Sequence, residues 1–191
     1  MTNSNIPLII DMLRQSMAER QTPFLTVTSN SMAPLLKTGD QVGLSPVEVA
    51  QLNRGDIITL VQDEHLLTHR FWGTDEQGRP FTRGDRPLMP DAPGKTGQIL
   101  GRVTVRRRHN RELSLQRGAG RRLNEHLAWL VRVESVLLTG RPLSPTAPFV
   151  PPEKQRALII KLVRRAFLMW ASLAVKVLTR LAKQNHQQEL P

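Results

Sequence analysis

Between about residues 22 and 107, the chain alternates short runs rich in valine, isoleucine, threonine and leucine with turn-forming glycine, aspartate and proline. Runs of this length are typical of strands, and glycine permits the positive φ angles of tight turns. The predicted strands cover residues 24–28, 41–44, 56–61, 65–72 and 98–106. Short strands with frequent turns favour a compact antiparallel sheet or a small barrel, so we expect a mainly β domain here.

Helical patterns lie on both sides of this region. Apolar residues recur at helical spacing over 6–19, about 119–137 and about 153–183, and a further short strand is expected at 113–115. Five prolines between 142 and 152 predict a stiff linker that continues neither helix. The predicted parts are an N-terminal helix (1–21), the β domain (22–107), a strand and helix extension (108–141), the linker (142–152) and a C-terminal helix with its tail (153–191).

The excess of positive over negative charge lies entirely in the second half of the chain. Residues 1–100 hold 9 Lys and Arg against 11 Asp and Glu, whereas residues 101–191 hold 18 against 5, and the whole chain has a net charge of +11. This asymmetry points to an anionic partner, although arginine-rich helices with solvated polar faces give the same count. The absence of cysteine excludes disulfides, thiolate metal ligands and a cysteine nucleophile.

The strongest local signal is the stretch Thr28-Ser29-Asn30-Ser31-Met32-Ala33-Pro34. A predicted strand leads into it and Pro34 turns the chain out of it, so a rigid element would hold Ser31. A serine hydroxyl becomes a useful nucleophile only when a neighbouring base removes its proton. Taken alone, a serine before a turn more often caps that turn.

Further motifs follow Ser31 in a fixed order. The pairs Gly39-Asp40 and Gly55-Asp56 each precede a predicted strand, and Thr68-His69-Arg70 lies within the next one. Thr82-Arg83-Gly84-Asp85 comes next, then Asp91, and Gly101-Arg102-Val103 closes the series. This order, over about residues 22–107, resembles the type I signal peptidase family of serine peptidases. His69 stands where the bacterial enzymes have a lysine base, which resembles the archaeal and endoplasmic-reticulum branch with its histidine base.

The resemblance implies a role for each matched residue. Ser31 would be the nucleophile and His69 its base, while the Ser31 backbone N–H and the Ser29 hydroxyl would bind the oxyanion. Asp91 is our preferred residue for orienting His69, with Asp85 as the alternative. The chain departs from the pattern of that branch here, because Pro90 replaces the first of two aspartates and Arg86-Pro87 replaces the usual asparagines. No cofactor or metal is implied.

A purely structural interpretation of the same residues stays open. His69 shares a predicted strand face with Leu67 and Phe71, as a packed core histidine would. Asp85 and Asp91 flank prolines, where aspartates often stabilise turns. Arg70 faces the side opposite to His69, where it would pair with a carboxylate.

The last helix is basic and amphipathic. Its cations fall within one arc of the helical wheel and its apolar residues, including Trp170 and Val177, fill the opposite side. Such a helix can lie in the interface of an anionic membrane, with 153–183 as the contacting segment. The alternative, which we favour slightly, is that its apolar face packs on the 119–137 helix or on the sheet.

We therefore expect a serine endopeptidase that removes a leader or signal segment from a precursor peptide or protein. The sequence displays no exported leader and no apolar segment of about 20 residues, so the expected location is the cytoplasm, either free or peripheral on the inner membrane face. Nucleic acid is the less favoured partner. The rival hypotheses are a self-processing regulatory module and a non-catalytic protein whose basic half binds membrane or nucleic acid.

Overall fold

The computed structural model describes residues 6–62, 65–92, 98–109, 111–145 and 157–188, and within the last helix it describes the side chains of 162–177. The described helices are α1 (Ile6–Ala18), a 3₁₀ turn η1 (Val49–Gln51), α2 (Gly118–Thr139) and α3 (Ala157–Gln188). The strands are β1 (Phe24–Thr26), β2 (Gln41–Ser45), β3 (Ile57–Gln62), β4 (His65–Thr74), β5 (Pro80–Arg83), β6 (Gln98–Arg108) and β7 (Arg111–Ser114).

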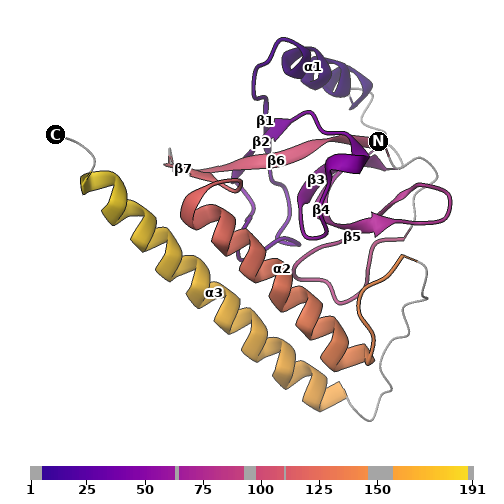
Figure 1. Cartoon of the computed structure of the whole chain (residues 1–191), viewed down its shortest axis with the longest axis vertical. Helices are drawn as coiled ribbons and strands as arrows, with labels where there is room; N and C mark the ends of the chain where they lie inside the picture. Colours follow the sequence, from indigo (N-terminus) through magenta and orange to yellow (C-terminus); the bar gives the residue numbers. More distant parts are fainter. Residues whose placement is uncertain (1–5, 63–64, 93–97, 110, 146–156, 189–191) are drawn as a thin grey trace.

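The seven strands form one sheet in which every pairing is antiparallel (Figure 1). The order is β1-β2-β6-β3-β4-β5, and β7 adds to β6. The long strand β6 joins the two halves, because its first residues pair with β3 and its later residues with β2 and β7. The expected antiparallel sheet is confirmed. Its pairing order runs from β1 at one end to β5 at the other.

Most predicted elements appear within a few residues of their expected bounds. The exception is β5, which the sequence interpretation treated as a motif and not as a strand. It is only four residues long and begins at Pro80, so it carries no alternating apolar pattern. Its pairing with β4, including Arg70 opposite Arg83, places the Thr82-Arg83-Gly84-Asp85 segment beside His69.

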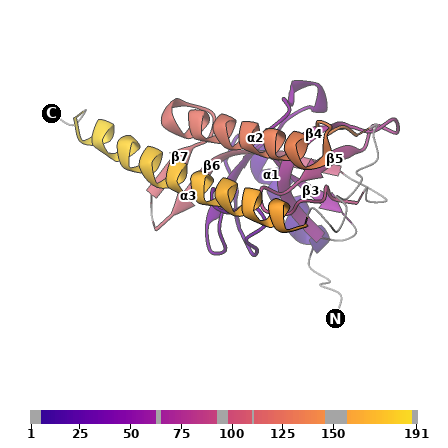
Figure 2. The same ribbon diagram turned by 90° about the horizontal axis from the view of Figure 1, so that it is seen from below.

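One hydrophobic core collects side chains from the sheet and from all three helices. Its members include Ile10, Leu13 and Met17 of α1, Val42 and Leu44 of β2, Leu123 and Leu127 of α2, and Ala171 and Val175 of α3. Figures 1 and 2 show α1 at one end of the sheet and the pair α2 and α3 along its opposite side. The terminal helices therefore share the core of the β region and do not form separate units.

Helix α3 lies alongside α2, as the slightly favoured alternative expected (Figure 2). Phe167, Ala171, Ala174 and Val175 face the core. Trp170 and Val177 belong to the same apolar side of the helical wheel but are exposed, so packing accounts for only part of that side. The protein core and α2 therefore cover only part of the apolar side of α3.

The described part of the predicted linker ends at Pro145, and residues 146–152, like 153–156 at the predicted start of the last helix, lie outside the described residues. Leu143 is buried with Trp72 and Val131, so the chain leaving α2 packs back on the sheet. Within the described residues, no helix combines the length and the apolar character that crossing a bilayer requires.

Candidate active site

Ser31 lies in a tight turn that follows β1. The next residues hold this turn in place, because Met32, Leu35 and Leu36 are all buried in the main core. The Ser31 carbonyl oxygen also accepts a hydrogen bond from the backbone N–H of Arg86, at 2.8 Å. The serine is thus fixed from both sides, by apolar anchors and by the loop after β5, while its own side chain stays at the surface edge.

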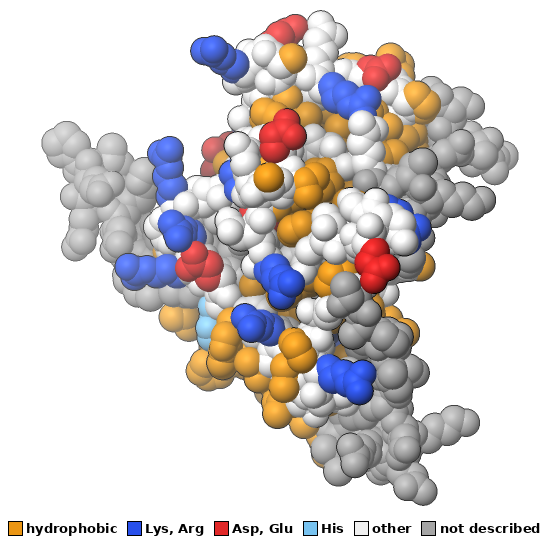
Figure 3. All heavy atoms as spheres, turned by 45° about the vertical axis from the view of Figure 1, so that its right-hand side comes forward, with side chains coloured by type: hydrophobic (Ala, Val, Ile, Leu, Met, Phe, Trp, Pro, Cys, Tyr) orange, Lys and Arg blue, Asp and Glu red, His pale blue; other side chains and the backbone are white. Residues whose placement is uncertain are grey.

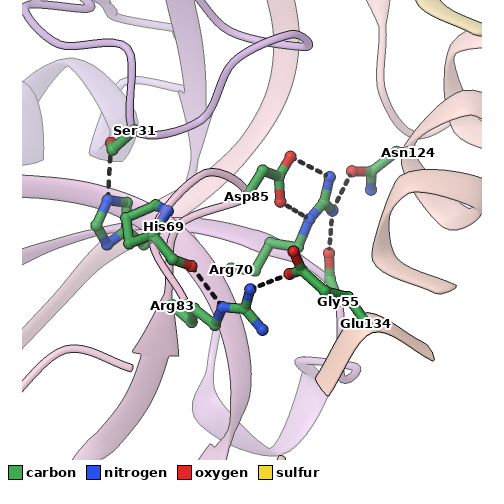
Figure 4. Close-up of polar contacts among 9 residues, drawn as sticks. Ser31, Gly55, His69, Arg70, Arg83, Asp85, Asn124 and Glu134 are labelled. Carbon is green, nitrogen blue, oxygen red and sulfur yellow. Dashed lines mark hydrogen bonds and ion pairs between the residues drawn. The ribbon is translucent and has the colours of Figure 1, made fainter. Parts of the chain in front are cut away.

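His69 reaches Ser31 from the middle of β4. His69 is 4% exposed, and its Nε2 lies 2.8 Å from the Ser31 Oγ (Figure 4). This is hydrogen-bond distance, so a neutral His69 with its proton on Nδ1 can accept the hydroxyl proton at Nε2. The two residues that the sequence interpretation paired across 38 positions do meet.

Asp91 completes the contact on the other side of the imidazole. Its Oδ2 lies 2.6 Å from His69 Nδ1. The Thr82 hydroxyl donates to the same carboxylate oxygen at 2.7 Å, and the Asp91 N–H donates to the Thr82 carbonyl at 2.9 Å. These bonds hold the carboxylate where it favours the Nδ1–H tautomer of His69, which leaves Nε2 free to act as a base.

The chain matches no protein-family model and no curated protein.

Gly84 makes the close approach of Ser31 and His69 possible. A Cβ atom at this position would lie 2.9 Å from the Ser31 carbonyl oxygen, 3.0 Å from His69 Nε2 and 2.8 Å from the Cδ of Pro87. Contacts this short require the backbone or the imidazole to move. The glycine of the Gly84-Asp85 pair is therefore needed for space beside the site.

Asp85, the alternative candidate for orienting His69, lies elsewhere. Its two carboxylate oxygens accept hydrogen bonds from Arg70 at 2.5 and 3.0 Å, in a bidentate pair that is almost fully buried. Arg70 also donates to the Gly55 carbonyl at 2.7 Å and to Asn124 of α2 at 2.6 Å. Figure 4 shows this cluster apart from the Ser31–His69 contact. The structure thus assigns Asp91, and not Asp85, to the imidazole.

A second buried pair lies beside the first one. Arg83 of β5 donates to Glu134 of α2 (Figure 4). It also donates to the carbonyl of Pro87, at 2.7 Å. Burial lowers the pKa of the Arg83 guanidinium, and the negative charge of Glu134 partly offsets that shift. Arg164 of α3 contacts the same glutamate at 3.2 Å. These contacts tie α2 and α3 to the loop that holds Ser31.

The expected oxyanion donors lie next to the nucleophile. The Ser29 Oγ is 3.1 Å from the Ser31 Oγ, and it accepts the Ser31 backbone N–H at 3.4 Å. A bond of that length is weak. The backbone N–H of Ser31 and the Ser29 hydroxyl are therefore both available to a substrate oxygen that arrives between them.

Two surface depressions meet at Ser31. One lies between β1 and β4, and its lining combines apolar side chains, including Leu25, Val27, Met32 and Leu66, with several serines and threonines. The other is shallow, and the ionisable residues among its described lining are Arg86, Arg164 and Arg165. A peptide laid across Ser31 would contact the partly apolar groove on one side and the basic surface on the other.

The sequence interpretation missed Asn124 and Glu134. Both stand on the apolar side of α2, next to Leu123 and Leu130, and both are buried. A polar residue on the buried side of an amphipathic helix signals a buried partner. Among the described residues, no group of three or more His, Asp and Glu side chains could hold a metal ion.

Proposed function

We propose that the protein is a serine endopeptidase that cleaves a precursor peptide or protein through an acyl-enzyme. The observation that carries the proposal is the continuous chain of contacts from the Ser31 hydroxyl through His69 to Asp91. A nucleophile, a base and a group that orients the base are the three parts that serine acyl transfer requires. The Asp91 carboxylate is itself held by Thr82, which fixes the geometry of the base.

In the acylation step, His69 Nε2 takes the Ser31 hydroxyl proton while Oγ bonds to the peptide carbonyl carbon. The resulting oxyanion accepts hydrogen bonds from the Ser31 N–H and the Ser29 hydroxyl. When the C–N bond breaks, the amine leaves with the proton from His69, and Ser31 is left as an ester. A water molecule then gives its proton to His69 and attacks the ester, and Ser31 recovers its proton as the acid leaves.

The order of motifs along the chain adds support from resemblance. Ser31, His69 and Gly84-Asp85 follow one another as in the histidine branch of the type I signal peptidases, which cleave leader segments from precursors. The antiparallel sheet that carries these motifs is compatible with such a domain. We therefore propose a signal-peptidase-like fold for the β region and a leader or signal segment as the part removed.

The two depressions at Ser31 suggest how the substrate binds. Strand β1 ends the pairing order of the sheet, so an extended peptide can add to it through main-chain hydrogen bonds. Its apolar side chains would enter the groove between β1 and β4. On the other side of the scissile bond, Arg86 and Arg165 would favour acidic side chains of the substrate.

Exposure of a proteome-derived peptide library to the protein would test the proposal. Wild type should generate new N-termini, with apolar residues on one side of the cut and acidic residues on the other. Ser31→Ala, incubated in parallel, should generate none of them. Incubation of the purified protein alone would detect self-processing as a separate outcome. If the same cuts persisted in Ser31→Ala, the peptidase proposal would be wrong.

A further inference from the structure

Exposed apolar side chains gather on the outer face of the helix pair. Trp129 and Val136 of α2 and Met169, Trp170, Leu173 and Val177 of α3 are all exposed, and four of these six are more than half exposed. Figure 3 shows hydrophobic side chains concentrated over the lower, helical part of the molecule. Large exposed patches of this kind are uncommon on soluble domains, and they mark contact surfaces.

A cluster of three rings joins the two helices into one surface. The His126 ring stacks on Trp129 with centroids 5.8 Å apart, and it lies 6.4 Å from the Trp170 ring. The Trp170 indole N–H also donates to His126 Nε2 at 3.0 Å. The apolar side chains of α2 and α3 therefore project together, and we refer to these six residues and His126 as the outer face.

Cations surround the outer face. Arg122 and Arg132 are exposed on α2, one or two turns from Trp129, and Arg165 and Lys176 are exposed on α3, on either side of Met169 and Leu173. Within the described part of the chain, none of these four cations has an ion pair, whereas the nearby Glu125 is paired with Arg121. The face thus combines apolar and aromatic side chains with a positive border.

We propose that the outer face binds the surface of an anionic membrane, with α2 and α3 lying in the plane of the interface. Tryptophan favours the boundary between headgroups and acyl chains, and long cationic side chains reach from that depth to lipid phosphates. Each such cation typically strengthens binding about fivefold, so four are a substantial contribution. The negative surface of the cytoplasmic leaflet matches this charge.

The charge pattern argues against a second copy of the chain as the occupant. A symmetric contact through the outer face would bring the same four cations of two protomers together, with repulsion between them. Nucleic acid would match the charge, but it offers no apolar phase for the residues between the cations. An anionic bilayer complements both the apolar centre and the charged border.

This placement bears on access to Ser31. Arg165 lines both the basic surface beside Ser31 and the outer face, so the nucleophile lies about one helix width from the membrane contact. A precursor held at the membrane would reach the site directly. The proposal itself does not depend on catalysis, because the contacts of the outer face exist whether or not Ser31 reacts.

Binding of the full chain to lipid vesicles tests the proposal. Wild type should bind vesicles of phosphatidylcholine with one third phosphatidylglycerol at least about tenfold more tightly than pure phosphatidylcholine, and more weakly as salt rises. The double substitution Met169→Glu with Leu173→Glu should lower binding to the anionic vesicles at least about tenfold. Brominated acyl chains should quench tryptophan fluorescence of wild type, because Trp129 and Trp170 enter the interface while Trp72 is buried.

The chain offers a matched control on α1. Leu8 and Met12 are 61% and 60% exposed, against 67% for Met169 and 53% for Leu173, so Leu8→Glu with Met12→Glu makes the same change in charge and in exposed apolar surface. This control should bind like wild type. Equal losses in the two double variants, or no preference for anionic vesicles, would overturn the proposal. So would a wild-type dimer in sedimentation that Met169→Glu with Leu173→Glu dissociates.

Discussion

The side chains of two consecutive residues of β4, His69 and Arg70, lie in different environments on opposite faces of the sheet. His69 points to one face of the sheet, where it contacts the partly exposed Ser31 and Asp91. Arg70 points to the other face, where Asp85, Asn124 and the Gly55 carbonyl enclose it completely. Each side pairs a basic group with an aspartate at about 2.5 Å.

The two sides differ in whether the basic side chain is still able to take part in a reaction. The guanidinium of Arg70 is permanently charged and uses its N–H groups within the cluster, so that side can only hold the structure together. The imidazole of His69 can gain or lose a proton, and its Nε2 faces a hydroxyl that a substrate can reach. We therefore expect substitutions on the His69 side to alter rate and substitutions on the Arg70 side to alter stability.

Asp91→Asn should produce the largest effect on rate. An amide in place of the carboxylate disfavours the tautomer that leaves Nε2 free, and an equivalent change in a serine protease costs about 10⁴-fold in kcat. Thermal unfolding should change little, because the shape of the side chain is kept. The measurement is kcat on a peptide identified with wild type. Asp11→Asn, on the exposed surface of α1, serves as the control and should retain full activity.

Asp85→Ala should lower stability more than any change at the His69 side. It leaves the buried Arg70 charge without its bidentate partner, which typically costs about 3–5 kcal/mol. Denaturant unfolding would measure it. Addition of Arg70→Met to Asp85→Ala should recover part of the loss, since it removes the unpaired charge. A variant as stable as wild type would contradict the structural role of the Arg70 side.

Ser29→Ala should affect rate without affecting stability. Loss of one oxyanion donor typically lowers kcat about 10²- to 10³-fold. KM should stay nearly unchanged, because the donor acts on the charge that develops in the transition state and not on the bound peptide. Ser29→Thr keeps a hydroxyl and should retain more activity than Ser29→Ala. Equal kcat values for wild type and Ser29→Ala would exclude the hydroxyl from the oxyanion site.

Gly84→Ala tests whether the glycine is needed for the close approach of Ser31 and His69. The added methyl group would push on both His69 Nε2 and the Ser31 carbonyl, and a displacement of about 1 Å in such a site can cost about 10²-fold in rate. Gly78→Ala is an informative comparison, because nothing lies within 4 Å of its would-be Cβ. The only cost of Gly78→Ala is the backbone strain of an alanine at positive φ, far from the site, so its kcat should stay close to that of wild type.

Local patterns were sufficient to predict most of the β region. Short apolar runs predicted five of its strands (β1, β2, β3, β4 and β6) and a further short run predicted β7, and the motif order predicted the pairing of Ser31 with His69. Strand β5 was not predicted, because its four residues, which begin at Pro80, show no alternating apolar pattern. The choice between Asp85 and Asp91 also depended on the structure, since the turn after β5 decides which carboxylate reaches the imidazole.

For the helices, the pattern within one helix predicts where the helix lies but not which of its residues the rest of the protein covers. Periodicity predicted α2 and α3 but not how much of the apolar side of each helix the other would cover, so it left open whether Trp170 is buried or exposed. Asn124 and Glu134 are polar residues on a buried side, and their partners Arg70 and Arg83 lie more than 50 positions away. Contacts at that separation follow from the tertiary fold and not from local spacing.

Covalent labelling is the most direct test of whether His69 activates Ser31 as a nucleophile. Wild type and His69→Gln would be treated with a serine-directed phosphonate, and the modified residue would be located by peptide mass analysis. We predict an adduct on Ser31 in wild type, formed at least about 10²-fold more slowly in His69→Gln because the hydroxyl then lacks its base. Equal labelling rates in the two proteins, or no adduct on Ser31 in wild type, would contradict the account.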